Sequence, residues 1–319
     1  MWSFLNGLHI LRSRVIFSHR GDLVKAKNLR GPLLLLITAA IWGSTFVAQN
    51  DAMNSIGPCT FNAIRTFLGG LVLLPVLWIM KKRRPQESFG DKKTLYIGGI
   101  CCGAALAIAS VVQSWGIASA EVGKAGFISA LYIVIVPLIA AVFLKKKLPL
   151  IIIPCILLAV VGLYLLCMSG SFGLSFGELL VLISTLFFSI HILVIGAFSP
   201  KVNGIALSCI QFFSAAIISA ILALIFEVDA FSFASLKAAA FPIIYAGVFA
   251  IGVADTFQII AQKDTDPTIA SLIMSLESVF AVLSGWIFLH ETLTLRELLG
   301  CLLVFIAVIL SELPIKKKE

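Results

Sequence analysis

Apolar residues occur along the chain in long runs, which are separated by short breaks containing charged residues, glycine or proline. A helix of about 20 apolar residues crosses the hydrocarbon core of a bilayer. The pattern therefore predicts an all-α integral membrane protein with ten transmembrane helices. The predicted spans are 32–50, 60–80, 95–117, 123–144, 149–168, 176–198, 204–226, 238–261, 267–289 and 294–313.

The second half of the chain repeats the first half at an offset of 145 or 146 residues. Arg65 aligns with Gln211, Gln113 aligns with Gln258, and the segment "FLKKKL" aligns with "FLHETL". Each predicted half contains five helices, and an odd number makes the second half enter the membrane from the opposite side. We therefore expect two inverted five-helix repeats, an arrangement from which many transporters build alternating access around a site at the midplane.

The predicted repeats divide the chain into four parts. Residues 1–31 are a basic cytoplasmic N-terminal extension, 32–168 the first repeat, 176–313 the second repeat, and 314–319 a basic cytoplasmic tail. The extension lacks the uninterrupted apolar region and the small-residue cleavage site of a signal peptide. Two further interpretations stay open for it, an amphipathic helix on the membrane surface and translation from a wrongly assigned start codon.

Charge supports a membrane protein and indicates its orientation. Charged residues make up 13% of the sequence, against about 25% in ordinary soluble domains. The formal net charge is +8, but the basic residues lie in short loops and tails, so no nucleic-acid partner is expected. In the predicted topology they gather on one side, and the other side receives only Lys124, Lys237 and Arg296. The positive-inside rule then predicts a multi-pass protein of the cell (plasma) membrane with both termini in the cytoplasm.

Several segments resemble the EamA family of the drug/metabolite transporter superfamily. They are "AAIWGSTFVAQN", "GPCTFNAIRTFLGGLVLLP", "GKAGFISALYIVIVPLIA" and "ASLIMSLESVFAVLSGWIFLHETLTLRELLG". The resemblance covers residues 32 to 313, and it implies a ten-helix carrier with a central cavity lined mainly by helices 1–4 and 6–9. It also implies export of amino acids or other small metabolites.

One position departs from the family pattern. Where the family often has Glu-Pro in helix 9, this chain has Glu277 followed by Ser278. A proline kink is therefore not expected there, although Pro137 could still bend the related helix 4. Glu291 matches a position that is often acidic in the family, and we expect it to cap the next helix.

Four ionisable residues lie inside predicted spans, where a charge at the bilayer centre costs about 2.5–3.5 kcal/mol on insertion scales. Arg65 shares a helix face with Asn62, and it either points into a polar seam to grip a carboxylate or snorkels outward. Glu277 either binds a substrate amine, accepts a coupling proton, or stays neutral within the bundle. Asp255 either lines an inner vestibule, where it binds a substrate amine or takes part in proton coupling, or it lies at the interface. His191 either relays protons or is a neutral, hydrogen-bonded histidine.

Neutral polar residues inside apolar helices complete the predicted cavity lining. They are Trp42, Thr45, Gln49, Gln113, Gln211 and Gln258. A small zwitterion requires several polar groups that converge in an otherwise apolar pocket. Hydrogen bonding between helices could also explain any one of these residues.

The sequence therefore predicts a secondary active transporter, an exporter of small metabolites such as amino acids, with protons as a candidate coupling ion. A phosphate-binding G-x-x-x-x-G-K-[ST] loop and an H-E-x-x-H motif are both absent from the sequence, and the seven cysteines lack the paired spacing of a zinc site. No cofactor, metal site or enzyme activity is expected. The alternatives are a membrane-embedded enzyme and a channel-like facilitator, and the oligomeric state stays open.

Overall fold

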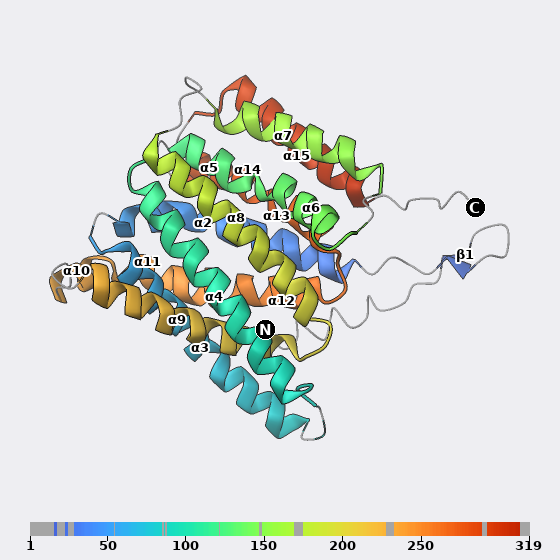
Figure 1. Ribbon diagram of the computed structural model, residues 1–319. Helices are drawn as coiled ribbons and strands as arrows, with labels where there is room; N and C mark the ends of the chain where they lie inside the picture. Colours follow the sequence, from blue (N-terminus) through green and yellow to red (C-terminus); the bar gives the residue numbers. More distant parts are fainter. Residues whose placement is uncertain are drawn as a thin grey trace.

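The computed structural model describes most of the chain, which folds into a bundle of helices (Figure 1). The described residues are 16–17, 23–24, 29–53, 55–84, 86, 88–120, 122–146, 149–168, 175–227, 233–288 and 292–312. The predicted tail at 314–319, Glu291 and most of the N-terminal extension lie outside them. In the extension, β1 (Ile16–Phe17) pairs antiparallel with β2 (Leu23–Val24), so these four residues do not form the amphipathic helix considered for this segment.

Helices occupy all five predicted spans of the first half. They are α2 (Arg30–Met53), α3 (Pro58–Arg83), α4 (Lys92–Ile117), α5 (Val122–Ala130), α6 (Tyr132–Val142) and α7 (Ile152–Cys167). Local residues determine where two of these helices begin. Pro58 opens α3, where its missing N–H is not needed, and Asp91 caps α4 by accepting a hydrogen bond from the Thr94 backbone N–H. The fourth predicted span, 123–144 (span 4, counting along the chain), is divided between α5 and α6 at Leu131.

Helical elements also occupy all five predicted spans of the second half. They are α8 (Phe176–Phe198), α9 (Gly204–Phe226), α10 (Phe233–Ala238), α11 (Ala240–Tyr245), η3 (Ala246–Asp255), α12 (Thr256–Gln262), α13 (Pro267–Met274), α14 (Glu277–Phe288) and α15 (Leu295–Glu312). Ser175 and Glu178 form a capping box at the start of α8, and Asn203 caps α9. Span 8 contains a π-helical stretch, η3, and span 9 is divided between α13 and α14.

Seven helical stretches among the described residues are long and apolar enough to cross a membrane. They are Pro58–Arg83, Lys92–Ile117, Ala125–Val142, Phe176–Phe198, Gly204–Phe226, Ala240–Gln262 and Pro267–Ile287. The apolar helix α7 is shorter, at 16 residues. Helices α2 and α15 occupy the two remaining predicted spans. The structure thus has helix at every predicted span, while a count of ten crossings stays a prediction.

The helices of the two halves pack on each other in matching pairs. Helix α3 packs on α9 and α7 packs on α15, which joins span 2 to span 7 and span 5 to span 10. The other main contacts also occur in equivalent pairs, since α4 lies against α8 and α9 while η3 lies against α2 and α3. Figure 1 shows α7 and α15 side by side along the upper edge, with α3 and α9 on the opposite side of the bundle.

Two close contacts repeat across the halves and support this internal symmetry. A Cβ at Gly103 would lie 2.6 Å from the backbone oxygen of Gln211, and a Cβ at Gly247 would lie 3.0 Å from that of Arg65. Gln211 is the counterpart of Arg65, and Gly247 lies within one residue of the position equivalent to Gly103. Only glycine permits helices to approach so closely. The same helix contact therefore occurs once on each side of a pseudo-twofold axis.

The connections join at two opposite ends of the bundle. At one end the Lys146 Nζ lies 3.4 Å from an Asp266 carboxylate oxygen, and the Asn203 backbone N–H donates to the Phe89 oxygen at 3.0 Å. At the other end the Glu227 carboxylate accepts bonds from the Cys59 and Thr60 backbone N–H groups at 2.7 and 2.8 Å. Since alternating connections meet at the same end, the chain runs back and forth as the predicted topology requires.

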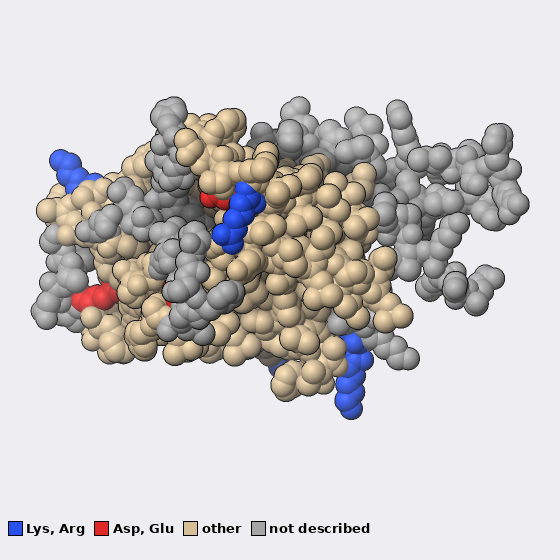
Figure 2. Space-filling view, turned by 90° about the horizontal axis from the view of Figure 1, so that it is seen from above, with Lys and Arg blue, Asp and Glu red and all other residues tan. Residues whose placement is uncertain are grey.

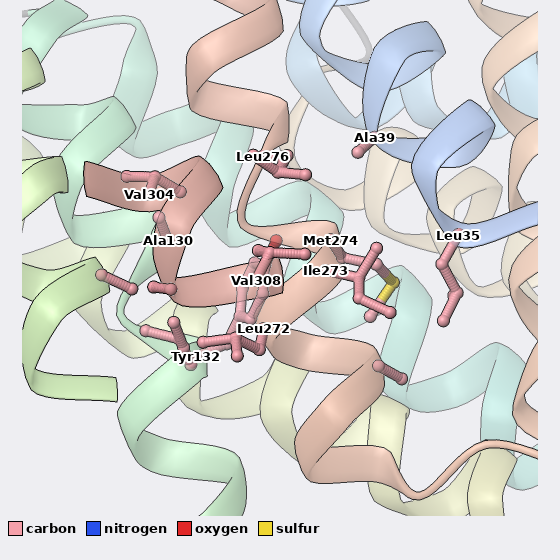
Figure 3. Packing of buried hydrophobic residues seen from close by; sticks show 14 of the residues in the cluster. Leu35, Ala39, Ala130, Tyr132, Leu272, Ile273, Met274, Leu276, Val304 and Val308 are labelled. Carbon is pink, nitrogen blue, oxygen red and sulfur yellow. The ribbon is translucent and has the colours of Figure 1, made fainter. Parts of the chain in front are cut away.

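Apolar side chains serve both the interior and the outer surface. Inside, residues of α2, α6, α13 and α15 meet in one core, where Leu35, Tyr132, Ile273 and Val304 are each at most 5% exposed (Figure 3). Outside, most of the described surface visible in Figure 2 is uncharged, with a few charged side chains scattered over it. A large uncharged surface over a well-packed core is typical of a protein that lies in lipid.

Replacing Gly300 by valine is expected to destabilise the contact between α7 and α15. A Cβ at this position would lie 2.7 Å from the Gly162 oxygen and 2.8 Å from the Leu166 backbone nitrogen, so the helices must separate. We expect the free energy of unfolding to fall by about 1–3 kcal/mol, as in overpacked cores. Thermal unfolding in detergent measures the change.

The matched control for Gly300 is Gly126→Ala. A Cβ at Gly126 would meet only the Cys167 sulfur, at the ordinary contact distance of 3.9 Å. Alanine there should leave the melting temperature unchanged or raise it, because alanine is the better helix former. Equal melting temperatures for the Gly300→Val variant and the wild type would show that the close packing of α7 on α15 is wrong.

Candidate functional site

A cavity of about 90 Å³ lies between the two halves of the bundle. This space is enough for several water molecules or a small solute. Its walls come from α2, α3, α4, α5, α6, α8, η3, α12 and α14. The lining residues are Trp42, Thr45, Gln49, Arg65, Leu106, Ser110, Gln113, Ser129, Tyr132, Phe188, His191, Ile192, Ala250, Ile251, Asp255, Gln258 and Glu277. All predicted site residues except Gln211 are therefore brought together.

The lining consists largely of residues that are equivalent in the two repeats. At offsets of 145 or 146 residues the lining contains the pairs Trp42 and Phe188, Thr45 and His191, Leu106 and Ile251, Ser110 and Asp255, Gln113 and Gln258, and Tyr132 and Glu277. The cavity thus lies at the pseudo-twofold axis. Charge does not follow this symmetry, because each ionisable residue of the lining has a neutral counterpart.

Arg65 points into the bundle and is only 6% exposed, so outward snorkelling is the wrong alternative for its side chain. Its Nε donates a hydrogen bond to Asn62 Oδ1 at 2.8 Å, and its Cζ lies 5.1 Å from the centre of the Phe61 ring. Asn62 is held in turn by Ser114, whose Oγ accepts from Asn62 Nδ2 at 3.0 Å. Among the described residues, only the Nε of this guanidinium has a hydrogen-bond partner, so both Nη groups can serve a ligand.

Asp255 lies at the end of the π-helical stretch η3, a kind of irregularity that is frequent at functional sites. Its Oδ1 accepts a hydrogen bond from Trp42 Nε1 at 2.9 Å, and the Arg65 charge attracts it across the cavity. Within the described part of the chain no ion pair of 4.0 Å or less joins the two. The residue is 3% exposed and lines the central cavity, so it has the lining position that was expected and not the interfacial one.

Glu277 is the first residue of α14, immediately after the break in span 9. The break needs no proline. Helix α13 ends at Met274, and the chain turns through Ser275, whose hydroxyl donates to the Leu272 oxygen at 2.7 Å; such bonds compete with the helix ladder. In the related span 4 the break is at Leu131, whereas Pro137 lies farther along, inside α6. The interruption of span 4 therefore lies at Leu131, before the proline at which a bend was expected.

The remaining predicted residues form a hydrogen-bonded polar lining. His191 Nε2 lies 3.1 Å from Gln211 Oε1, so Gln211 supports the histidine from outside the cavity. Gln113 Nε2 donates to Ser129 Oγ at 3.2 Å. Gln49 Nε2 donates to Ser114 Oγ at 3.4 Å and Thr45 Oγ1 to the Ile41 oxygen at 2.6 Å. In the described residues Gln258 Oε1 has no partner.

Sequence reasoning missed three polar residues of the lining, namely Ser110, Ser129 and Tyr132. Hydroxyl groups are common in membrane helices because they can bond to their own backbone, so they carry little signal alone. The repeat offset could have found two of them, because Ser110 is the counterpart of Asp255 and Tyr132 that of Glu277. Metal chemistry gains no support, since no cluster of three or more potential ligands occurs within the described ranges.

Comparison with known proteins gives consistent matches. A family model described as the EamA-like transporter family matches residues 29–168 and 175–313. An uncharacterized transporter of Archaeoglobus fulgidus is 32% identical over 302 residues, which are 93% of this chain and 90% of the relative. The uncharacterized transporter YoaV of Bacillus subtilis is 20% identical over 289 residues, 89% of this chain and 97% of its own. One crystal structure shares the fold with a TM-score of 0.72 at 17% identity, over 88% of this chain and 96% of its own.

Proposed function

Because the chain belongs to the EamA-like transporter family, we propose that it is a secondary active exporter of small zwitterionic metabolites such as amino acids. The substrate binds in the central cavity and crosses the membrane by alternating access. Protons are the coupling ion. The family predicted from the sequence motifs is confirmed, and the finer statements are the proposal.

The proposed topology has ten crossings in two inverted repeats, with both termini in the cytoplasm. It is supported by the helix found at each predicted span, by the equivalent packing of the two halves, and by the basic residues at one end of the bundle. The proposed location is the plasma membrane. Inverted repeats around a midplane site are the usual basis of alternating access.

The observation that carries the proposal is the charge arrangement of the cavity. Arg65 offers two free Nη groups, which match the two oxygens of a carboxylate. Asp255 and Glu277 provide negative charge on other walls of the same small space. A buried space with charges of both signs and apolar walls suits a small zwitterion, which carries both signs itself.

Proton coupling rests on the surroundings of Glu277. The side chain is 7% exposed, and no lysine, arginine or histidine within the described residues lies within 4.0 Å of its carboxyl. A buried carboxylate without a positive partner is very unfavourable. Glu277 therefore holds either a proton or a cationic group of the substrate, and exchange of one for the other couples the two fluxes.

The channel-like facilitator and the membrane-embedded enzyme predict different behaviour. A channel lets its solute pass without holding it, so labelled solute outside is not drawn in by unlabelled solute inside. An enzyme forms a new product. A carrier binds one substrate on one side at a time, so it exchanges labelled for unlabelled substrate and saturates with concentration.

Counterflow in proteoliposomes distinguishes these cases. Vesicles with the purified full chain are loaded with unlabelled L-alanine, a probe small enough for the cavity, and diluted into labelled L-alanine. We expect a transient, saturable accumulation of label that empty vesicles lack. Uptake that is linear in concentration and unaffected by internal alanine would contradict the carrier, and chemical conversion of the label would indicate an enzyme.

A further inference from the structure

The two broken spans meet at one point of the cavity. Span 4 breaks at Leu131, between α5 and α6, and span 9 breaks at Leu276, between α13 and α14, which is the equivalent position 145 residues later. The residues that follow the breaks are Tyr132 and Glu277. Helix α13 packs against α6, and both side chains line the cavity. The broken helices therefore present one hydroxyl and one carboxyl to the same space.

Neither of these two groups has a hydrogen-bond partner among the described residues. Tyr132 is 5% exposed, and its Oη forms no hydrogen bond to any described residue. The Glu277 carboxyl lines the same cavity as this hydroxyl, and no hydrogen bond of 3.5 Å or less joins them. Buried polar groups are almost always satisfied. An unpartnered hydroxyl beside an unpaired carboxyl thus indicates that a ligand with N–H donors completes them.

The charged residues of the lining determine how the proposed ligand is oriented in the cavity. Among the described lining residues, the one arginine or lysine is Arg65, which belongs to the first repeat, whereas Asp255 and Glu277 both belong to the second. Asp255 already accepts the Trp42 indole N–H and faces the Arg65 charge. Glu277 is left as the acidic group whose charge is uncompensated. The carboxylate of a zwitterion is drawn to Arg65, and its positive end is drawn to Glu277.

We propose that Tyr132 and Glu277 together form the ammonium subsite of the carrier, at the point where its two broken helices meet. This inference rests on the proposed function. An ammonium group has three N–H donors, of which Glu277 accepts one or two and the Tyr132 oxygen accepts another. Tyr132 thereby becomes a specificity-determining residue that selects solutes with a primary amine.

Removing the Tyr132 hydroxyl tests the subsite. In the counterflow assay with L-alanine, Tyr132→Phe is expected to raise the half-saturating concentration about 10-fold, the effect of one lost hydrogen bond to a charged group. Propionate lacks the ammonium group, and its potency as a competitor should stay unchanged because it uses Arg65 alone. Tyr96→Phe is the matched control, since Tyr96 lies outside the cavity lining and is exposed near the start of α4.

Exchanging the two residues gives a second, independent test. Glu277→Tyr alone removes the carboxyl and should abolish counterflow. The double variant Tyr132→Glu with Glu277→Tyr returns a carboxyl to the equivalent place across the pseudo-twofold axis, and it should recover at least about a tenth of the wild-type rate. Such a rescue would not follow if either residue only supported the fold.

The outcomes separate this inference from the function on which it rests. Wild-type counterflow together with the selective defect of Tyr132→Phe supports the ammonium subsite. Wild-type counterflow with an unchanged Tyr132→Phe variant, or with equal losses for alanine and propionate, overturns the subsite and leaves the carrier intact. Absence of wild-type counterflow by correctly folded protein overturns the proposed transport of zwitterions, and the subsite with it.

Discussion

Replacing Arg65 by glutamine is expected to lower the rate of L-alanine counterflow at limiting concentration about 100-fold, as happens when one member of a buried charged pair is removed. The carboxylate of the substrate would lose the two Nη donors, and Asp255 would lose the positive charge that it faces. Glutamine is a mild replacement at this position, because the equivalent residue of the second repeat is Gln211. The variant should therefore fold, and melting in detergent checks that it does.

A second basic residue provides the control for Arg65. Lys82 is exposed at the end of α3, where its Nζ lies 5.2 Å from the centre of the Trp78 ring. Lys82→Gln removes the same charge from the same helix but leaves the cavity untouched, so its counterflow should equal that of the wild type. Equal activity of the Arg65→Gln and Lys82→Gln variants would show that the guanidinium has no part in substrate binding.

Replacing Glu277 by glutamine is expected to abolish accumulation of L-alanine that is driven by a pH gradient. Export coupled to proton entry means that substrate and protons move in opposite directions. Vesicles with an acidic interior should therefore concentrate labelled alanine above its external level as protons leave. Glutamine has the shape of glutamate but cannot release a proton, so the Glu277→Gln variant can at best equilibrate alanine.

The control for Glu277 changes another carboxyl to an amide. Asp264 is exposed in the turn between α12 and α13, away from the residues of the lining. Asp264→Asn should accumulate alanine as the wild type does under the same gradient. If Glu277→Gln accumulated it equally well, the coupling proton would have to bind elsewhere, and Asp255 would be the next carboxyl to change.

The spans were predictable because hydrophobic runs record the thickness of the bilayer, and the repeat was predictable because its offset persists over both halves. The helix breaks at Leu131 and at Ser275 and Leu276 were not predictable. A membrane helix stays apolar through a single irregular turn, so the hydrophobic pattern does not change there. The π-helical stretch at Ala246–Asp255 left no signal for the same reason.

The residues of the site could be predicted because they are polar or charged and lie inside apolar spans. A guanidinium, two carboxyls and several amides inside apolar spans must find polar surroundings, and the structure gathers all but Gln211 around one cavity. The direction in which the Arg65 side chain points was harder to predict. Arg65 lies near a helix end, where snorkelling and inward packing both satisfy the charge, and only the contacts with Asn62 and Phe61 decide between them.

The internal repeat identifies a lining residue that could not be recognised from its own residue type. Tyr132 is an ordinary apolar-span residue until it is aligned with Glu277, after which both follow equivalent helix breaks. In the proposed function, similar backbone geometry in two inverted halves lets the bundle open to either side of the membrane. The unequal charges of the two halves then orient the proposed zwitterion in the cavity. The proposal thus combines symmetric movement with an asymmetric binding site.

The most direct test of the central claim compares the metabolites released by cells that express the wild type, Arg65→Gln or Glu277→Gln at matched membrane levels. If the cavity carries small zwitterions outward, medium from wild-type cells will be enriched in one or more amino acids, and medium from both variants will not. Equal enrichment in all three would contradict the assignment of transport to this cavity.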